Sequence, residues 1–316
     1  MKLFGKKTSL LITAFVAVVF TLYFVFNTER FRPLLEINIY LLGIIVLANF
    51  VGIFTNGLFT KFILEPFNKF ISVSESLYVS VISSIGNFFA PAGTGFGIRA
   101  LYLKKKHGLP YSEFISTLSG NYVIVLLINS FMGLVALYFL RDQYSAQYLV
   151  LTIVFSLMFV VSLALSLIRF PLSEEDRVAK SKSWLVKSFF RVIYGWSKIV
   201  SNKWLILRLI SLVSANFLLA TFMYWAIIES VHLSIGIPEL LLFTVLGSLT
   251  IFINITPANL GVKEAIYLFS SSVLGFSVSD ILLIAIVDRG VQFTVLFTLW
   301  IVSLRLKAKE RLNLEL

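Results

Sequence analysis

Long apolar runs set the strongest limit on what this sequence can fold into. A helix that crosses a bilayer needs about 20 predominantly apolar residues, and the sequence offers such runs repeatedly. Only 14% of the residues are charged and 58% are hydrophobic, whereas soluble domains carry about 25% charged residues. A water-soluble fold is therefore excluded, and an all-α polytopic membrane protein is predicted. The six predicted spans are Ser9–Phe26, Leu34–Phe59, Phe114–Leu140, Tyr148–Ile168, Leu205–Ile228 and Ile281–Leu304.

Two further apolar stretches are each interrupted near the middle by a Pro-Ala pair and glycines. They are Ile71–Leu103 and Pro238–Leu274. Proline and glycine break helices, so a continuous span is disfavoured at both places. We predict that each stretch is a re-entrant hairpin, which enters and leaves the membrane on the same side. The alternative is that each crosses fully, which gives eight spans.

The distribution of Lys and Arg favours the hairpins. Cytoplasmic loops carry the excess of these residues, and with two hairpins most of the 27 basic residues fall on one side. If each stretch crossed once, Lys104–Lys106 would lie outside. We therefore expect a multi-pass protein of the cell membrane whose N- and C-termini are both cytoplasmic.

The two interrupted stretches also resemble each other. Pro91-Ala92-Gly93-Thr94-Gly95 corresponds to Pro257-Ala258-Asn259-Leu260-Gly261, and the spans around them match at similar offsets. Residues 1–140 and 141–316 therefore form two predicted repeats, each with three spans and one hairpin. Because three crossings is an odd number, the second repeat is inverted. Inverted repeats with paired broken helices are typical of secondary transporters, whose substrate site lies at the breaks.

Four charged residues are the main candidates for a substrate site, because charge inside a membrane is costly and usually functional. Arg99 and Glu264 follow the two breaks, and Asp288 and Arg289 lie inside the last span. Arg99 suits a phosphate, or it extends to the cytoplasmic headgroups. Glu264 either pairs with Arg99 or Arg289, with Arg289 as the first choice, carries a coupling proton, or forms an exposed pair with Lys263.

Uncharged residues at the breaks complete the predicted substrate site. Asn87 and Asn254 precede the breaks closely enough to line it, whereas the other membrane asparagines are expected mainly to tie helices together. The break residues themselves are Pro91, Gly95, Pro257 and Gly261. Neither His107 nor His232 has carboxylate companions at metal-ligand spacing, so no metal is predicted. No nucleotide-binding or nucleophile motif is present, and no cofactor is expected.

The loop 169–204 joins the two repeats and contains an amphipathic segment from Trp184 to Val200. Its apolar and basic residues fall on opposite sides of a helix, a pattern typical of helices that lie at a membrane surface. We expect contacts with anionic lipid headgroups at the cytoplasmic face. Nucleic acid is not a predicted partner, because the membrane topology already accounts for the basic residues.

Two blocks of sequence resemble the signature blocks of the lysylphosphatidylglycerol synthase transmembrane-region family, which is also called flippase-like. The first runs from Pro91-Ala92 through Gly97-Ile98-Arg99-Ala100 to Gly108-Leu109-Pro110. The second runs from Pro257 through Gly261-Val262-Lys263-Glu264-Ala265 and Gly275-Phe276-Ser277 to Arg289. The resemblance covers essentially the whole chain. At the positions of Gly97-Ile98 the family usually has Gly-Glu. This chain lacks the glutamate, so a role that the family gives to it is not expected here.

The resemblance implies a polytopic fold with re-entrant elements and an activity on lipids. Its best-known members move aminoacylated phosphatidylglycerol between leaflets, and others accompany glycosyltransferases that use polyprenyl-phosphate sugars. No aminoacyl-transferase or glycosyltransferase domain is recognisable here, so an enzyme that makes the lipid is not expected. The leading hypothesis is a flippase for a phosphate-bearing phospholipid or polyprenyl-phosphate lipid. The alternatives are a membrane enzyme and an accessory subunit of a lipid synthase or glycosyltransferase.

Overall fold

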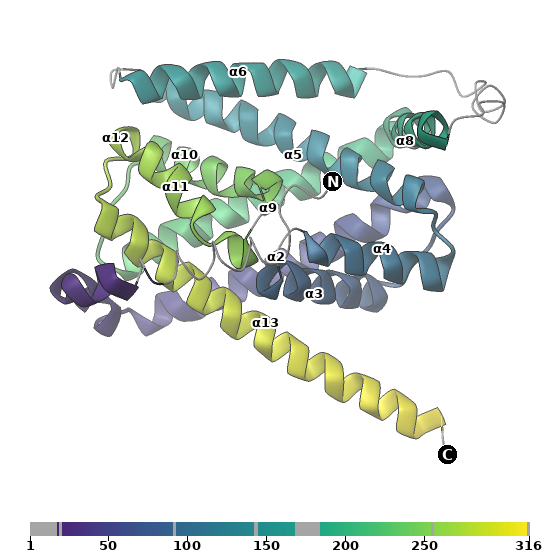
Figure 1. Cartoon of the computed structure of the whole chain (residues 1–316), viewed down its shortest axis with the longest axis horizontal. Coiled ribbons are helices and arrows are strands. Elements are labelled where there is room, and N and C mark those ends of the chain that lie inside the picture. Colours follow the sequence, from purple (N-terminus) through teal and green to yellow (C-terminus); the bar gives the residue numbers. More distant parts are fainter. Residues whose placement is uncertain are drawn as a thin grey trace.

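The computed structural model describes residues 18, 21–90, 93–141, 145–167, 184–253 and 256–314, and these residues form helices and connections without a strand (Figure 1). Five of these helices are long and apolar enough to cross a membrane. Their bounds are Ile39–Phe67, Tyr111–Phe139, Ala146–Leu167, Lys203–Ser230 and Val278–Ser303. Most of the first predicted span, Ser9–Phe26, lies outside the described residues. The chain is thus an all-α protein of the polytopic membrane class.

The second predicted span begins later than the apolar run suggests. The run starts at Leu34, but the 3-10 helix η1 (Thr28–Leu35) contains Pro33, and the α-helix α2 occupies Ile39–Ile63. Asn38 fixes this start, because its Oδ1 accepts the backbone N–H groups of Tyr40 and Leu41 at 3.0 and 3.3 Å. A short 3-10 helix, η2 (Glu65–Phe67), follows α2.

Helices α3 (Val73–Phe89) and α4 (Thr94–His107) run antiparallel around the first break (Figure 1). At one end, Glu75 of α3 accepts hydrogen bonds from Tyr102 at 2.8 Å and pairs with His107 at 2.7 Å. At the other end, the two helices approach so closely that a Cβ at Gly95 would overlap the carbonyl oxygen of Ser83. Only glycine fits at this position.

The described part of the chain also contains the long helices α5 (Tyr111–Phe139), α6 (Ala146–Leu167) and α9 (Lys203–Ser230). Figure 1 shows α6 lying along α5 at one edge of the molecule. The α6 face away from α5 is exposed and apolar, with Leu149, Ile153 and Leu157 each about 60% accessible. Exposed leucine and isoleucine in a continuous stripe are expected where lipid covers a helix.

The amphipathic segment forms helix α8 (Trp184–Ser201), but protein covers part of its apolar face. Trp196, Ile199 and Val200 are buried, and the first two approach Gly120 of α5. The indole Nε1 of Trp196 also donates to the carbonyl oxygen of Leu165 in α6 at 3.1 Å. The C-terminal part of this apolar face therefore packs on protein.

The second interrupted stretch forms several short helices before the last long helix. Helix α10 (Ile237–Leu249) continues into η4 (Thr250–Ile253). After the break come η5 (Pro257–Asn259), α11 (Val262–Phe269) and α12 (Ser271–Leu274). Tyr267 of α11 stacks on Phe243 of α10, with ring centroids 3.9 Å apart. Helix α13 (Val278–Leu314) then packs beside α11 and α3.

Candidate functional site

The two breaks lie next to the same cavity, which has a volume of about 310 Å³ and is called the break cavity below. Asn87 and Phe88 reach it from the end of α3, and Ala258 and Asn259 reach it from the second break. Ser84 of α3, the helices α9, α10, α11 and α13 and the short helix η4 supply the rest. The remaining lining residues are Ser84, Tyr224, Gly247, Ser248, Thr250, Ile251, Lys263, Asp288, Arg289, Gln292 and Leu296.

Two consecutive ion pairs join α11 to α13 beside this cavity. Lys263 Nζ lies 2.6 Å from Oδ2 of Asp288, and Arg289 Nη1 contacts Oε1 of Glu264. Both carboxylates are only 2% exposed. Unpaired charges are strongly destabilising at such depth, so pairing is required. The pair of Glu264 with Arg289 is the one that the sequence favoured.

Each carboxylate also accepts a hydrogen bond outside its ion pair. Gln292 Nε2 donates to the other oxygen of Asp288 at 3.0 Å. The backbone N–H of Gly261, at the start of α11, donates to Oε2 of Glu264 at 2.8 Å. Lys263 Nζ also lies 5.0 Å from the ring centroid of Tyr224, within range of a cation–π interaction. Both carboxylates are thereby fixed as acceptors with little freedom to move.

Arg289 keeps one edge of its guanidinium free. Its Nε and Nη2 are buried, and neither has a hydrogen-bond partner among the described residues. These two nitrogens form the side edge of the guanidinium, whereas Nη1 faces Glu264. A free edge with two parallel N–H donors matches the bidentate geometry of phosphate oxygens. Arg289, which lines the break cavity, therefore has two buried donor nitrogens that no described residue uses.

Both breaks are closed by an asparagine side chain. Asn87 Oδ1 accepts the backbone N–H of Gly95 at 2.9 Å across the first break. Asn259 Nδ2 donates to the carbonyl oxygen of Thr250 at 3.3 Å across the second. Ala258 and Asn259 have φ of 50° and 53°, a left-handed conformation that disfavours residues with a Cβ. Non-glycine residues in this region persist where the surroundings enforce them, often at functional sites.

Arg99 does not take part in this arrangement. Its Nε donates to Ser83 Oγ at 3.2 Å, on the neighbouring helix α3. It lines neither of the two cavities described here, and Arg289 rather than Arg99 pairs with Glu264. Arg99 and Glu264 occupy equivalent sequence positions after the two breaks, but their side chains do not pair with each other.

The other predicted site residues divide into three groups. Asn87, Asp288 and Arg289 line the break cavity. Glu264, Gly95, Pro257 and Gly261 lie beside the lining residues and hold them through the hydrogen bonds and helix starts described above. Pro91 and Asn254 lie outside the described residues.

Lys263 was not among the predicted site residues. An exposed pair of Lys263 with Glu264 was one alternative, but their side chains are only 11% and 3% accessible and each binds a different residue of α13. A signal was present, because the basic-acidic order of Lys263-Glu264 is complementary to the acidic-basic order of Asp288-Arg289. Asn259, Tyr224 and Gln292 carried no comparable signal.

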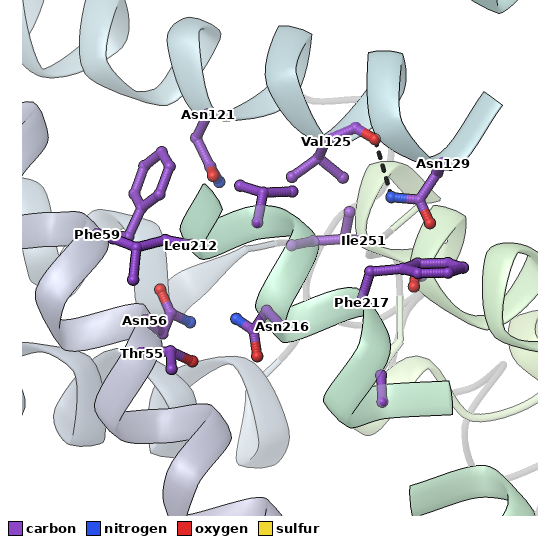
Figure 2. A pocket seen from close by; sticks show the side chains of 13 residues that line it. Thr55, Asn56, Phe59, Asn121, Val125, Asn129, Leu212, Asn216, Phe217 and Ile251 are labelled. Atoms are coloured by element: carbon purple, nitrogen blue, oxygen red, sulfur yellow. Dashed lines mark hydrogen bonds between the residues drawn. The ribbon is translucent and has the colours of Figure 1, made fainter. Parts of the chain in front are cut away.

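A second cavity of about 250 Å³ adjoins the first between α2, α5 and α9 (Figure 2). Ser248 and Ile251 line both cavities. Asparagine side chains from three helices reach the second one, which is called the amide cavity below; they are Asn56, Asn121, Asn129 and Asn216. Asn129 Nδ2 donates to the carbonyl oxygen of Val125 in its own helix at 2.8 Å, so this amide does not join two helices.

The apolar helices and the buried charge pairs define a multi-pass α-helical membrane protein. The chain belongs to the lysylphosphatidylglycerol synthase TM region family, whose model matches residues 8–299. This membership, which the two sequence blocks indicated, points to a membrane protein in lipid modification or transport. Comparisons with curated proteins and with solved structures gave no match.

Proposed function

We propose that the protein is a flippase that moves a phosphate-bearing lipid between the two leaflets of the cell membrane. The observation that carries this proposal is that Arg289, which lines the break cavity, has two buried donor nitrogens without a partner among the described residues. Lys263 supplies a second positive charge in the same lining. Although Asp288 and Glu264 balance these charges in the empty site, a phosphate adds hydrogen bonds to Nε and Nη2 that no described residue provides.

The surroundings of the cavity suit a lipid rather than a free phosphate. Phe88 and Leu296 line the cavity, and Phe89 and Phe293 beside them are 52% and 46% exposed, with ring centroids 6.0 Å apart. On α13 this exposed aromatic surface continues through Phe297 and Trp300. Acyl chains that remain in the bilayer can pack on this surface while the headgroup occupies the cavity.

The proposed membrane arrangement is that of two inverted repeats with a re-entrant hairpin in each. Helices α3 and α4 have 17 and 14 residues, about 25 and 21 Å at a rise of ~1.5 Å per residue. Neither length reaches the roughly 30 Å of the hydrocarbon core, which supports a hairpin. With both termini in the cytoplasm, the hairpins enter from opposite sides and their breaks meet at the cavity.

Transport is a better interpretation than catalysis because of how the carboxylates are held. A general acid or base must exchange a proton with substrate, but Asp288 is bound by Lys263 and Gln292, and Glu264 by Arg289 and Gly261. We therefore propose that the protein is not an enzyme. Anionic headgroups at the cytoplasmic face, through the basic residues of α8, and a lipid synthase or glycosyltransferase are its proposed partners.

The proposal is tested by changing the lipid. Purified protein is reconstituted in liposomes that contain an acyl-labelled phosphatidylglycerol or, as a control without phosphate, an acyl-labelled glucosyl diacylglycerol. The rate at which label becomes accessible to a membrane-impermeant quencher is measured. We expect faster exchange of the phosphate-bearing lipid only. Equal rates for both lipids, or no acceleration over empty liposomes, would contradict the proposal; binding of a partner enzyme without exchange would favour an accessory role.

A further inference from the structure

The amide cavity contains more hydrogen-bonding capacity than the protein uses. Each asparagine amide offers two N–H donors and one carbonyl acceptor. Figure 2 shows the amides of Asn56 and Asn216 facing each other from α2 and α9, with that of Asn121 above them on α5. None of these three amides has a hydrogen-bond partner in the described part of the chain. Asn129 is 3% exposed, and its buried Oδ1 is likewise unpaired there.

This unused capacity lies near the middle of two helices that are long and apolar enough to cross a membrane. Asn216 is near the middle of α9, and Asn121 and Asn129 are in the central part of α5. Polar groups in that region are normally paired, because the hydrocarbon offers no hydrogen bonds. These four amides do not pair with one another, which leaves donors and acceptors for an occupant that bonds to them.

The chemistry of the lining restricts what this occupant is. Among the described residues that line the amide cavity, none carries a charge, and Phe59, Leu212 and Phe217 supply apolar surface beside the amides. Amide groups donate to and accept from hydroxyl groups, and apolar walls pack against the C–H groups between those hydroxyls. An ammonium group finds no carboxylate there, and the two nearby carboxylates already hold Lys263 and Arg289.

The position of the amide cavity links it to the phosphate site. Ser248 and Ile251 line both cavities, so the two spaces share a wall at the junction of α10 and η4. Each cavity alone, at about 250 and 310 Å³, is near the lower limit of the roughly 300–1,000 Å³ of ligand pockets. Together they accommodate a headgroup with a charged and an uncharged part.

We propose that the amide cavity binds an uncharged, hydroxyl-bearing part of the lipid headgroup, a glycerol or a sugar, while the phosphate of the same headgroup binds Arg289. This inference rests on the proposed function for its phosphate. It narrows the substrate to anionic lipids with polyol headgroups and excludes a preference for lipids whose headgroup carries an added ammonium group.

Equilibrium binding to the purified full-length protein tests the inference with matched probes. Short-chain phosphatidylglycerol is compared with phosphatidylpropanol, which has the same phosphodiester charge but lacks the two hydroxyl groups. An isoprenyl phosphate that carries a hexose is compared with one that carries a cyclohexyl group. We expect about fivefold tighter binding of the hydroxyl-bearing member, the scale of one net hydrogen bond. The pair that shows the preference distinguishes a glycerol from a sugar.

Two variants on different helices locate the preference. Asn121→Leu and Asn216→Leu remove amides that have no described partner, so folding should survive, and each should remove the preference. Asn49→Leu is the matched control, because Asn49 bonds to Ile45 and Met223 instead of lining the cavity. A preference that persists in both Leu variants would overturn the inference. So would the absence of any preference, which means that the cavity holds water only, or tighter binding of the lysyl ester of phosphatidylglycerol than of phosphatidylglycerol itself.

Binding also separates this inference from the proposed function. A protein that shows the Asn-dependent preference but moves no lipid contradicts the proposed transport and leaves the polyol site intact. A protein that moves phosphate-bearing lipids without any preference for hydroxyl groups contradicts the polyol site and leaves transport intact.

Discussion

Lys263 donates a hydrogen bond to Asp288 across 2.6 Å, and the next residue in each helix, Glu264 in α11 and Arg289 in α13, forms a second ion pair. The two pairs fix α11 against α13 directly after the second break. Removal of one partner leaves the other charge buried and uncompensated. A comparison of single with double variants therefore separates effects on stability from effects on function.

The first prediction concerns the Glu264–Arg289 pair. Arg289→Gln leaves the buried carboxylate of Glu264 without its cation. The free energy of unfolding should therefore fall by about 3 kcal/mol. The double variant Glu264→Gln/Arg289→Gln has no unpaired charge and should recover most of this loss. Thermal unfolding in detergent gives both values. Equal destabilisation of the single and the double variant would show that the two side chains do not form a coupled pair.

The second prediction concerns the contact between α3 and α4. Gly95→Ala places a methyl group against the Ser83 carbonyl and the Asn87 amide, so the first break cannot close as it does here. We expect a destabilisation of about 3 kcal/mol, at the upper end of overpacking costs. Gly97→Ala is the matched control, because a Cβ at Gly97 meets no atom within 4 Å. Similar unfolding temperatures for the two variants would contradict the close approach of the helices.

The third prediction concerns how the stability of the protein depends on pH through Glu75, which lies at the other end of the α3–α4 helix pair. Partial burial opposes ionisation of Glu75, but hydrogen bonds from His107, Lys106 and Tyr102 together lower its pKa from 4.5 to about 2. A carboxyl group with a depressed pKa stabilises the folded state above its unfolded pKa and loses this effect as the pH falls through its folded pKa.

Wild-type stability should therefore decline between pH 4.5 and about 2 more steeply than that of Glu75→Gln. The measurement is the difference between the unfolding temperatures of the two proteins at each pH. Carboxyl groups other than Glu75 are present in both proteins, so their contribution cancels in this difference. A constant difference across the window would contradict the ion pairing of Glu75.

The fourth prediction concerns membrane topology. The chain contains no cysteine, so a single introduced cysteine is the only thiol to label. Ser74→Cys and Lys105→Cys lie at the same end of the α3–α4 pair and should be protected from an impermeant thiol reagent in intact cells, whereas Arg141→Cys should react. Labelling of Lys105→Cys but not Ser74→Cys would support full crossings and eight spans.

The all-helical, polytopic class of the fold was predictable, because its main determinant is the length of the apolar runs and these can be identified locally in the sequence. Errors arose where a single polar residue decides a boundary: Asn38 caps α2 and moves its start from Leu34 to Ile39. The buried half of α8 was also missed, since periodicity does not reveal whether lipid or α5 covers Trp196.

The candidate site was predictable only in part. Glu264, Asp288 and Arg289 were identified because charge in an apolar helix is conspicuous, and the pair of Glu264 with Arg289 followed from charge alone. Arg99 lines neither cavity, and its equivalence to Glu264 in sequence does not determine which side of α4 faces a cavity. The amide cavity depends on three helices that are distant in sequence, and spacing along one chain does not reveal that their asparagines converge.

The central claim, that Arg289 binds the phosphate of a transported lipid, is tested most directly by measuring exchange of acyl-labelled phosphatidylglycerol in liposomes that contain the double variant Glu264→Gln/Arg289→Gln. This variant keeps the charge balance but lacks the guanidinium edge. Arg208→Gln is the control, because Arg208 is 57% exposed and lies outside both cavities. The account predicts that the folded double variant loses accelerated exchange while Arg208→Gln retains it. Wild-type exchange rates in the folded double variant would contradict the account.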